Sequence, residues 1–349
     1  MKNTKMKVAA MTALNKISML ERNIPKPRQG EALIKVDYVG ICGSDLHYFT
    51  SGRIGKDVVQ YPFVLGHEVS GTVIEVNSED SQLKKGDRVA IEPQITCGVC
   101  EFCKSGHYNL CRDVIFFATP PVDGVIQEYV THPADLCFKL PNEVSSLEGA
   151  LIEPLSVGLH AVLQGAGSVG QTAVVTGTGC IGLTSLLALR AYGVQDVLVT
   201  DLFERRLQKA RSLGARGTIN SSSEDAVQSI LNLTEGRGFD LAIETSGSEI
   251  AASQLISAAN RGATIVFVGY SNSGMMNLPM SEATDKELTF KTVFRYRNTY
   301  PLAISALANK QIDVKRIVSH TYAFEDTELA FKESVENKDE VIKAVIAFN

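Results

Sequence analysis

The sequence lacks the features that mark membrane, secreted and nucleic-acid-binding proteins. No apolar run approaches the ~18–20 residues of a membrane span, and the N-terminal lysines precede no apolar segment of the signal-peptide kind. Basic residues form no cluster and the formal net charge is −5. Neither nucleic acid nor a membrane is therefore an expected partner, and the protein is expected to be cytoplasmic.

Internal repeats and low-complexity segments are absent as well. The chain has 349 residues, which exceeds the roughly 250–300 at which a single core stops growing, so two domains are expected. Hydrophobic residues make up 44% and charged residues 21%, a balance typical of a globular enzyme.

The cysteines carry the most specific metal signal. In a reducing compartment disulfides are rare, yet four of the seven cysteines are crowded together as Cys97-x2-Cys100-x2-Cys103-x7-Cys111. Four thiolates form a closed tetrahedral zinc site with no position for a substrate, so the predicted role is structural. An iron–sulfur cluster is the smaller alternative. Cys137 and Cys180 are interpreted as ordinary buried thiols.

Periodicity divides the chain into two kinds of structure. The first ~150 residues indicate mainly β structure, with strands expected at 32–39, 71–76 and 86–91. After Pro154, apolar strands alternate with helices, which indicates a doubly wound parallel sheet. The strands of this second part are expected at 172–176, 197–200, 239–244 and 263–268, and its helices at 183–192, 204–213 and 250–259. After Lys291 the alternation fades, and the tail is expected to return to the first domain.

A glycine motif in the second part predicts a dinucleotide site. Gly177-Thr178-Gly179-Cys180-Ile181-Gly182 follows a strand and opens a helix, and Asp201 ends the next strand 19 residues after Gly182. The glycines let the backbone approach a pyrophosphate, and the helix start supplies amide donors. A second match at 165–170 precedes a strand and is interpreted as a turn. Asp201 favours NAD over NADP, although Arg206 either covers the adenine or weakens that preference.

A second, open metal site is suggested by residues from separate stretches. Cys42, Ser44 and His47 lie close together in sequence, His67 and Glu68 are adjacent, and Glu153 stands alone. Spacing cannot establish this site, because each residue also has an ordinary structural interpretation as a core thiol, a core histidine or a surface charge.

Several of these stretches resemble the zinc-dependent medium-chain dehydrogenases, and among them the sorbitol (polyol) dehydrogenases. The matching stretches are residues 40–47, Gly66-His67-Glu68, the four-cysteine segment, 116–121, 151–154 and 294–301. The resemblance implies an α/β chain with a GroES-like, mainly β catalytic zinc-binding domain at 1–156 that is completed by 296–349. It also implies a Rossmann-type, NAD-binding domain with a doubly wound parallel sheet at 157–295.

The resemblance also assigns roles to residues. It implies that the catalytic zinc is held by Cys42, His67, Glu68 and Glu153, with either glutamate as the inner ligand, and that Ser44 and His47 pass a proton outward. The implied substrate contacts are Tyr48, Phe116, Glu153, Arg295 and Tyr296. The implied cofactor neighbours, besides Gly177, Gly179, Gly182 and Asp201, are Ile181, Arg206, Val268, Gly269, Tyr270, Phe294 and Arg295.

The implied activity is oxidation of a secondary alcohol of a polyol, such as sorbitol or xylitol, to the ketose with NAD, similar to L-iditol 2-dehydrogenase. Zinc activates the alcohol, because water on zinc can ionise near pH ~7. One catalytic and one structural zinc per chain and a homodimer or homotetramer are expected. Threonine, butanediol or a sugar phosphate is the alternative substrate. A non-catalytic NAD- or zinc-binding protein is disfavoured, because Cys42 and His67 are intact.

Overall fold

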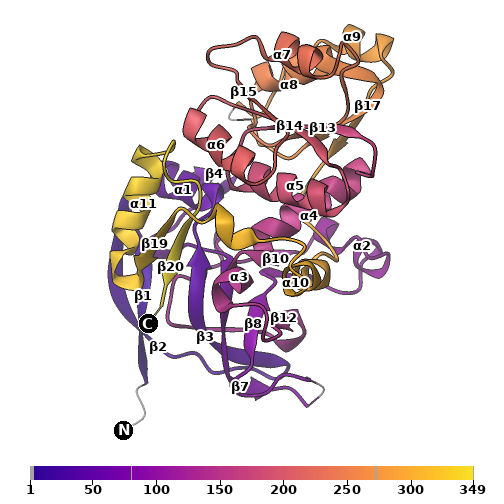
Figure 1. Cartoon of the computed structure of the whole chain (residues 1–349). Helices are drawn as coiled ribbons and strands as arrows, with labels where there is room; N and C mark the ends of the chain where they lie inside the picture. The colour runs from indigo at the N-terminus through magenta and orange to yellow at the C-terminus, as the bar shows by residue number, and fades with distance from the viewer. Residues whose placement is uncertain (1–3, 80, 272, 349) are drawn as a thin grey trace. The chain divides into compact units, whose positions relative to one another are not determined.

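The chain divides into two compact units in the computed structural model, which describes residues 4–79, 81–271 and 273–348 (Figure 1). The first unit holds the chain up to Glu153, Tyr300–Asn309 and the chain from Val318 onward. The second unit holds Pro154–Thr299 and Lys310–Ile317. The tail is thus shared between the units, since residues 310–317 group with the second one.

The first unit is built around a seven-stranded sheet with the order β12-β8-β7-β3-β20-β19, in which β11 also pairs with β3. Its strands are β3 (Glu31–Gly40), β7 (Glu68–Asn77), β8 (Arg88–Ile91), β11 (Tyr129–Pro133), β12 (Cys137–Lys139), β19 (His320–Ala323) and β20 (Ala344–Ala347). A three-stranded sheet has the order β2-β1-β6, with β1 (Lys5–Ala13), β2 (Lys16–Asn23) and β6 (Phe63–Val64). The core between them buries β-branched and aromatic side chains, including Val8, Ile34, Val69 and Phe331.

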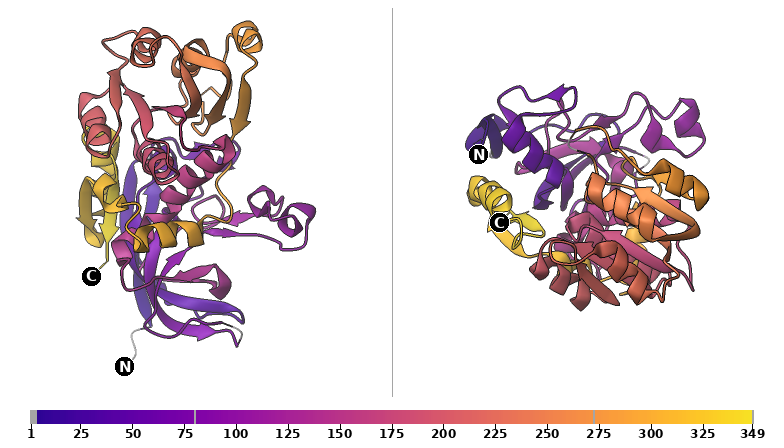
Figure 2. Two further views of the ribbon diagram at one scale, coloured as in Figure 1. Left: turned by 45° about the vertical axis from the view of Figure 1, so that its right-hand side comes forward. Right: turned by 90° about the horizontal axis from the view of Figure 1, so that it is seen from above.

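Short elements complete the first unit. They are α1 (Gly43–Ser51), β4 (Arg53–Ile54), β5 (Asp57–Val58), β9 (Gln94–Ile95), α2 (Glu101–Lys104), η1 (Tyr108–Leu110), β10 (Ile115–Phe116), η2 (Ala134–Leu136), α3 (Ser146–Ala150), α10 (Tyr300–Ala308), η4 (Phe324–Asp326) and α11 (Thr327–Glu336). Residues between β9 and β10 form a lobe that extends away from the sheet of this unit (Figure 2).

The second unit has a six-stranded parallel sheet with the order β15-β14-β13-β16-β17-β18. The elements are α4 (Ile152–Gly165), β13 (Thr172–Thr176), α5 (Cys180–Ala191), β14 (Asp196–Asp201), α6 (Glu204–Ser212), β15 (Gly217–Asn220), α7 (Ala226–Leu233), β16 (Phe239–Glu244), α8 (Glu249–Ala258), β17 (Ala259–Phe267), α9 (Met280–Asp285), β18 (Thr289–Thr292) and η3 (Val314–Ile317). The strand order reverses between β13 and β16, which is where ligands bind in such sheets.

The α/β class and the doubly wound sheet are confirmed, with differences at element ends and with β15, β18, α7 and α9 not predicted. The first helix of the second sheet begins at Cys180 rather than 183, because Gly179 is its N-cap and the glycine motif enters the helix directly. The helix α4 was not predicted, because Pro154 was interpreted as a boundary. Proline is in fact tolerated in the first turn of a helix, where Pro154 lies. Among the described residues, no helix is long and apolar enough to cross a membrane.

Candidate catalytic and cofactor sites

Three predicted zinc ligands lie together in the first unit. Cys42 is the N-cap of α1, directly after β3, while His67 and Glu68 stand at the start of β7. Because β3 and β7 pair antiparallel with Gly40 opposite Glu68, the two strand ends meet. One ligand atom from each of the three residues lies within 4.8 Å of the others. This sulfur, nitrogen and oxygen donor set is one that zinc accepts, so these residues fit a zinc ion.

Glu153 does not belong to this group. It is buried in the first turn of α4, but the metal-binding cluster found among the described residues contains only Cys42, His67 and Glu68. Three of the four residues implied by the resemblance are therefore grouped, and the part of Glu153 at the metal stays a prediction. Of the two glutamates, Glu68 is the one that the strand pairing places beside Cys42 and His67.

A buried carboxylate that the sequence analysis missed orients His67. Asp45 accepts hydrogen bonds from the backbone N–H of Cys42 (3.1 Å) and of Gly66 (2.9 Å), and its Oδ1 lies 3.6 Å from Nδ1 of His67. Burial raises the pKa of Asp45, but His67 and the two amides outweigh burial and lower that pKa. A metal-binding histidine commonly bonds a carboxylate in this way. The capping-box spacing from Cys42 to Asp45 was the available signal.

Glu68 has a buried cationic partner that was also missed. Lys343 precedes β20, its Nζ bonds the Glu68 carboxylate and donates to the carbonyl of Ile41 (2.9 Å), and both charged side chains are 1% exposed. A Cβ on Gly40 would lie 2.0 Å from the Glu68 carboxylate, so this pair requires glycine there. The residues are 275 positions apart, and no local pattern in the sequence connects them.

The other predicted site residues of this unit differ in burial and in their contacts with the metal cluster. Phe116 is buried, and its ring centroid lies 5.4 Å from that of His67. Tyr48 is buried in α1 and packs near Phe63. On the same helix Ser44 is half-buried and His47 is exposed.

The four cysteines of the lobe have the geometry of a closed zinc site. Their Sγ atoms are 3.5 Å apart for Cys100 and Cys103, 3.5 Å for Cys97 and Cys111, and 3.9 Å for Cys97 and Cys103. Tetrahedral thiolates with ~2.3 Å bonds to zinc are ~3.8 Å apart, whereas a disulfide is ~2.0 Å long. Backbone amides lower the pKa of Cys97 to about 7, which favours the thiolate. These residues fit zinc.

The two remaining cysteine assignments differ in outcome. Cys137 is buried in β12, as predicted, and burial raises the pKa of its thiol to about 12. Cys180 is only half-buried, which corrects the prediction of a buried thiol. It is the first residue of α5 and therefore stands in the glycine motif rather than in the core.

The glycine motif of the second unit forms a tight backbone turn that no side chain fills. Gly177 has a positive φ of 82°, and a Cβ on Gly182 would lie 1.7 Å from the carbonyl oxygen of Gly177. Ile181, in the first turn of α5, is half-buried. The backbone amides at the start of this helix point the way that the pyrophosphate of a dinucleotide requires. In the second match, Gly165 ends α4 and Gly170 turns with a φ of 86° before β13, as predicted for a turn.

Asp201 is fixed at the end of β14 beside this turn. Its carboxylate accepts hydrogen bonds from the N–H (2.6 Å) and hydroxyl (2.8 Å) of Thr178 and from the N–H of Phe203 (3.0 Å). Arg206 lies on α6 with its guanidinium over the Phe203 ring, 5.4 Å from the centroid. A fixed carboxylate at this position fits the ribose hydroxyls of NAD.

Glu244 is a further buried carboxylate that the sequence analysis did not identify. It ends β16 and accepts hydrogen bonds from the hydroxyl of Thr176 (3.2 Å) and the N–H groups of Ser246 (2.8 Å) and Gly247 (3.1 Å). Its backbone carbonyl accepts from the N–H groups of Val268 (2.8 Å) and Gly269 (3.0 Å). The predicted cofactor neighbours after β17 are therefore held to the end of β16.

The segment after β18 combines exposed and buried residues. Arg295 has a φ of 55° and places its guanidinium 4.8 Å from the centre of the Phe294 ring. Phe294 is 40% exposed, whereas the predicted substrate contact Tyr296 is fully buried. Tyr270, another predicted cofactor neighbour, is 76% exposed.

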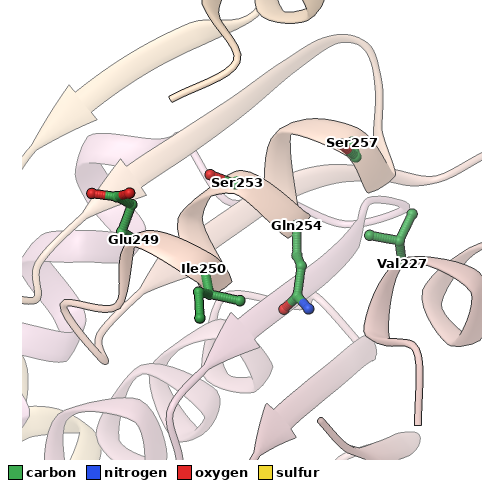
Figure 3. A pocket seen from close by; sticks show the side chains of 6 residues that line it. All are labelled: Val227, Glu249, Ile250, Ser253, Gln254 and Ser257. Atoms are coloured by element: carbon green, nitrogen blue, oxygen red, sulfur yellow. The ribbon is translucent and has the colours of Figure 1, made fainter. Parts of the chain in front are cut away.

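A groove of about 320 Å³ lies elsewhere in the second unit, on α7 and α8 (Figure 3). Its lining residues are Val227, Glu249, Ile250, Ser253, Gln254 and Ser257. Figure 3 shows these side chains along the two helices. None of the lining residues is among the predicted site residues.

Comparisons with known proteins agree with this geometry. The family model described as alcohol dehydrogenase GroES-like domain matches residues 28–142, and the one described as zinc-binding dehydrogenase matches 180–309. Sorbitol dehydrogenase of Bacillus subtilis (strain 168) is 42% identical over 341 residues, which are 98% of this chain and 97% of that protein.

Solved structures have the same fold over the whole chain. An Escherichia coli oxidoreductase of unknown specificity matches with a TM-score of 0.94 at 39% identity, covering 99% of each chain. An alcohol dehydrogenase of Escherichia coli CFT073, solved with NADH, matches with a TM-score of 0.92 at 29% identity, covering 99% of this chain and 100% of the other. The protein therefore belongs to the zinc-dependent medium-chain dehydrogenases, is similar to their sorbitol dehydrogenases, and uses the zinc and NAD typical of that family.

Proposed function

We propose that this protein oxidises a secondary hydroxyl of a polyol, such as sorbitol or xylitol, to the ketose and reduces NAD. The observation that carries the proposal is the meeting of Cys42, His67 and Glu68 beside the ring of Phe116. The carbinol carbon gives a hydride to the nicotinamide, and its hydroxyl gives up a proton, so the alcohol loses two electrons and two hydrogens.

The first unit is proposed as the catalytic domain. Cys42, His67 and Glu68 hold the zinc, whose Lewis acidity favours loss of the hydroxyl proton. Asp45 fixes the ring of His67 in the orientation that a metal ligand needs. Ser44 and His47 are proposed to pass the proton outward, and His47 suits the end of this path because it is exposed.

The proposed substrate contacts supply donors for a molecule with several hydroxyls. Tyr48, Arg295 and Tyr296 carry phenol and guanidinium donors for neighbouring oxygens, and Phe116 is proposed as a wall of the site. Glu153 is proposed to act on substrate or water beside the zinc, or to reach the metal itself, from outside the three-residue cluster.

The second unit is proposed as the NAD-binding domain. Gly177, Gly179 and Gly182 leave room for the pyrophosphate, and Asp201 is placed for the ribose hydroxyls. The proposed neighbours of the nicotinamide and adenine are Ile181, Arg206, Val268, Gly269, Tyr270, Phe294 and Arg295. We also propose a cytoplasmic homodimer or homotetramer, formed by edge pairing of the sheets of this domain.

The test is NADH formation with sorbitol, xylitol, ribitol, threonine and butanediol, with and without a chelator. We expect turnover of the polyols with NAD, inhibition by the chelator and two zinc ions per chain by metal analysis. Turnover of threonine or butanediol alone would assign another secondary alcohol, and stronger binding of NADP than NAD would contradict the role of Asp201.

A further inference from the structure

The four-cysteine lobe is an insertion between two very short strands. β9 and β10 pair through only two residues each, Ile95 with Ile115 and Gln94 with Phe116. A ladder this short is not stable by itself, so the place of Phe116 depends on what fixes the two ends of the lobe. The cysteines fix the far end through their metal.

Glu92 fixes the near end of the lobe. The residue is 2% exposed, and its carboxylate accepts hydrogen bonds from the hydroxyl of Tyr108 (2.9 Å) and from Nε2 of Gln94 (2.8 Å). Tyr108 lies in η1, between the third and fourth cysteine. A buried carboxyl group is costly without such partners, so this contact joins the lobe firmly to the sheet.

The backbone of Glu92 is held as well as its side chain. Its N–H donates to the carbonyl of Leu136 (2.9 Å), and its carbonyl accepts from Nε2 of His132 (2.8 Å). The ring of His132 packs on Phe117, with centroids 4.7 Å apart. The backbone of Glu92 is thus held by the sheet, while its side chain holds Tyr108 of the lobe.

The same residues lead to the catalytic cluster. Gln94, which bonds Glu92, is paired in the ladder with Phe116. The ring of Phe116 lies 5.4 Å from His67. A chain of direct contacts therefore runs from Tyr108 in the lobe through Glu92 and Gln94 to the aromatic side chain beside the zinc ligand.

We propose that Tyr108 and Glu92 are positioning residues for substrate binding, which hold Phe116 against His67 by joining the cysteine lobe to strand β9. Neither residue touches the substrate. The inference rests on the proposed function only in taking Phe116 as a wall of the substrate site. It gives the lobe a role in binding the polyol beyond local stability.

The test compares Tyr108→Phe with a matched control in the same lobe. Tyr108→Phe removes one hydroxyl, and we expect a three- to tenfold rise in KM for the polyol with kcat and KM for NAD within twofold. Arg112→Ala is the control, because it removes an exposed ion pair with Glu101 (3.3 Å) and a contact over the Phe102 ring but leaves Tyr108 and Glu92 in place. Its constants should equal those of the parent. Glu92→Gln retains an amide oxygen that accepts from Tyr108, so its KM for the polyol should lie between those of the parent and of Tyr108→Phe.

A second measurement needs no turnover, which separates this proposal from the proposed function. Hydrogen exchange of the zinc-loaded protein should speed up at Phe116 and Phe117 in Tyr108→Phe but not in Arg112→Ala, with both zinc ions retained. Unchanged exchange at Phe116 together with an unchanged polyol KM overturns the positioning role. Faster exchange in a protein that oxidises no polyol supports the positioning role and refutes only the proposed substrate.

Discussion

At the scale of single residues, Asp45 offers the sharpest test of the metal cluster. Asp45→Asn removes the charge that faces His67 and leaves one acceptor for two backbone amides. Loss of such a partner typically costs 10- to 100-fold in metal affinity or activity, and we expect a loss in that range in both zinc affinity and kcat. Competition with a chromogenic chelator measures the affinity. Thr50→Ala, on the same helix, is the control, and equal zinc affinity for the two variants would contradict the role of Asp45.

The buried pair of Lys343 and Glu68 makes a second prediction at this scale. Lys343→Met leaves the Glu68 carboxylate buried without its cation, which should lower the free energy of unfolding by about 3–5 kcal/mol. The double variant Lys343→Met, Glu68→Gln should recover part of this loss, because no uncompensated charge remains. Urea denaturation of the metal-free proteins measures both. A double variant no more stable than Lys343→Met would show that packing, not charge, holds this contact.

The residue scale also marks the limit of what the sequence predicts. Cys42 and His67 were recognised only through a family resemblance, because spacing does not connect two separate stretches. No sequence pattern pointed to Lys343 as a partner of Glu68, because only the pairing of β20 with β3 brings it to Gly40. Asp45 had one, in its capping position three residues after Cys42.

At the scale of elements, the turn from β13 into α5 controls cofactor binding. Gly182→Ala would place a Cβ 1.7 Å from the carbonyl oxygen of Gly177, so the turn must open and the arrangement of its amides is lost. We expect at least a tenfold weaker Kd for NADH, measured by fluorescence titration. Gly170→Asn is the matched control, because it lies in the second glycine match, has open space and keeps a positive φ that asparagine tolerates. Equal Kd values for the two variants would place the dinucleotide elsewhere.

Elements were predicted well where one periodicity persisted over a whole segment. Four strands of the second sheet were found, among them β13 and β14, because they are short apolar runs bounded by turns. The edge strands β15 and β18 were not predicted, because each is short and only partly buried. The helix α4 was missed, since Pro154 resembles a boundary until its place in the first turn is known. The lobe was recognised by cysteine spacing, but its link to the sheet through Glu92 and Tyr108 depends on tertiary contacts.

At the scale of the whole molecule, buried neutral histidines predict how stability depends on pH. Burial lowers the pKa of His132 to about 4 in the first unit, and burial together with Arg297 lowers that of His160 to about 4 in the second. In the unfolded chain both titrate near ~6.5. Between these values the unfolded state binds more protons, so stability is full above pH ~6.5 and falls as the pH drops toward 4.

A non-titrating variant isolates one of these contributions. His132→Gln keeps a donor for the carbonyl of Glu92 but binds no proton, so its unfolding free energy should change less between pH 7 and 4.5. The difference between a pKa of about 4 in the folded protein and ~6.5 in the unfolded chain corresponds to about 3 kcal/mol of unfolding free energy for one histidine. Acid also weakens zinc–thiolate sites, but this effect is common to parent and variant and cancels in their difference. Urea denaturation at pH 7, 6, 5 and 4.5 measures that difference, and parallel curves for the two proteins would mean that His132 is not the group that couples folding to pH.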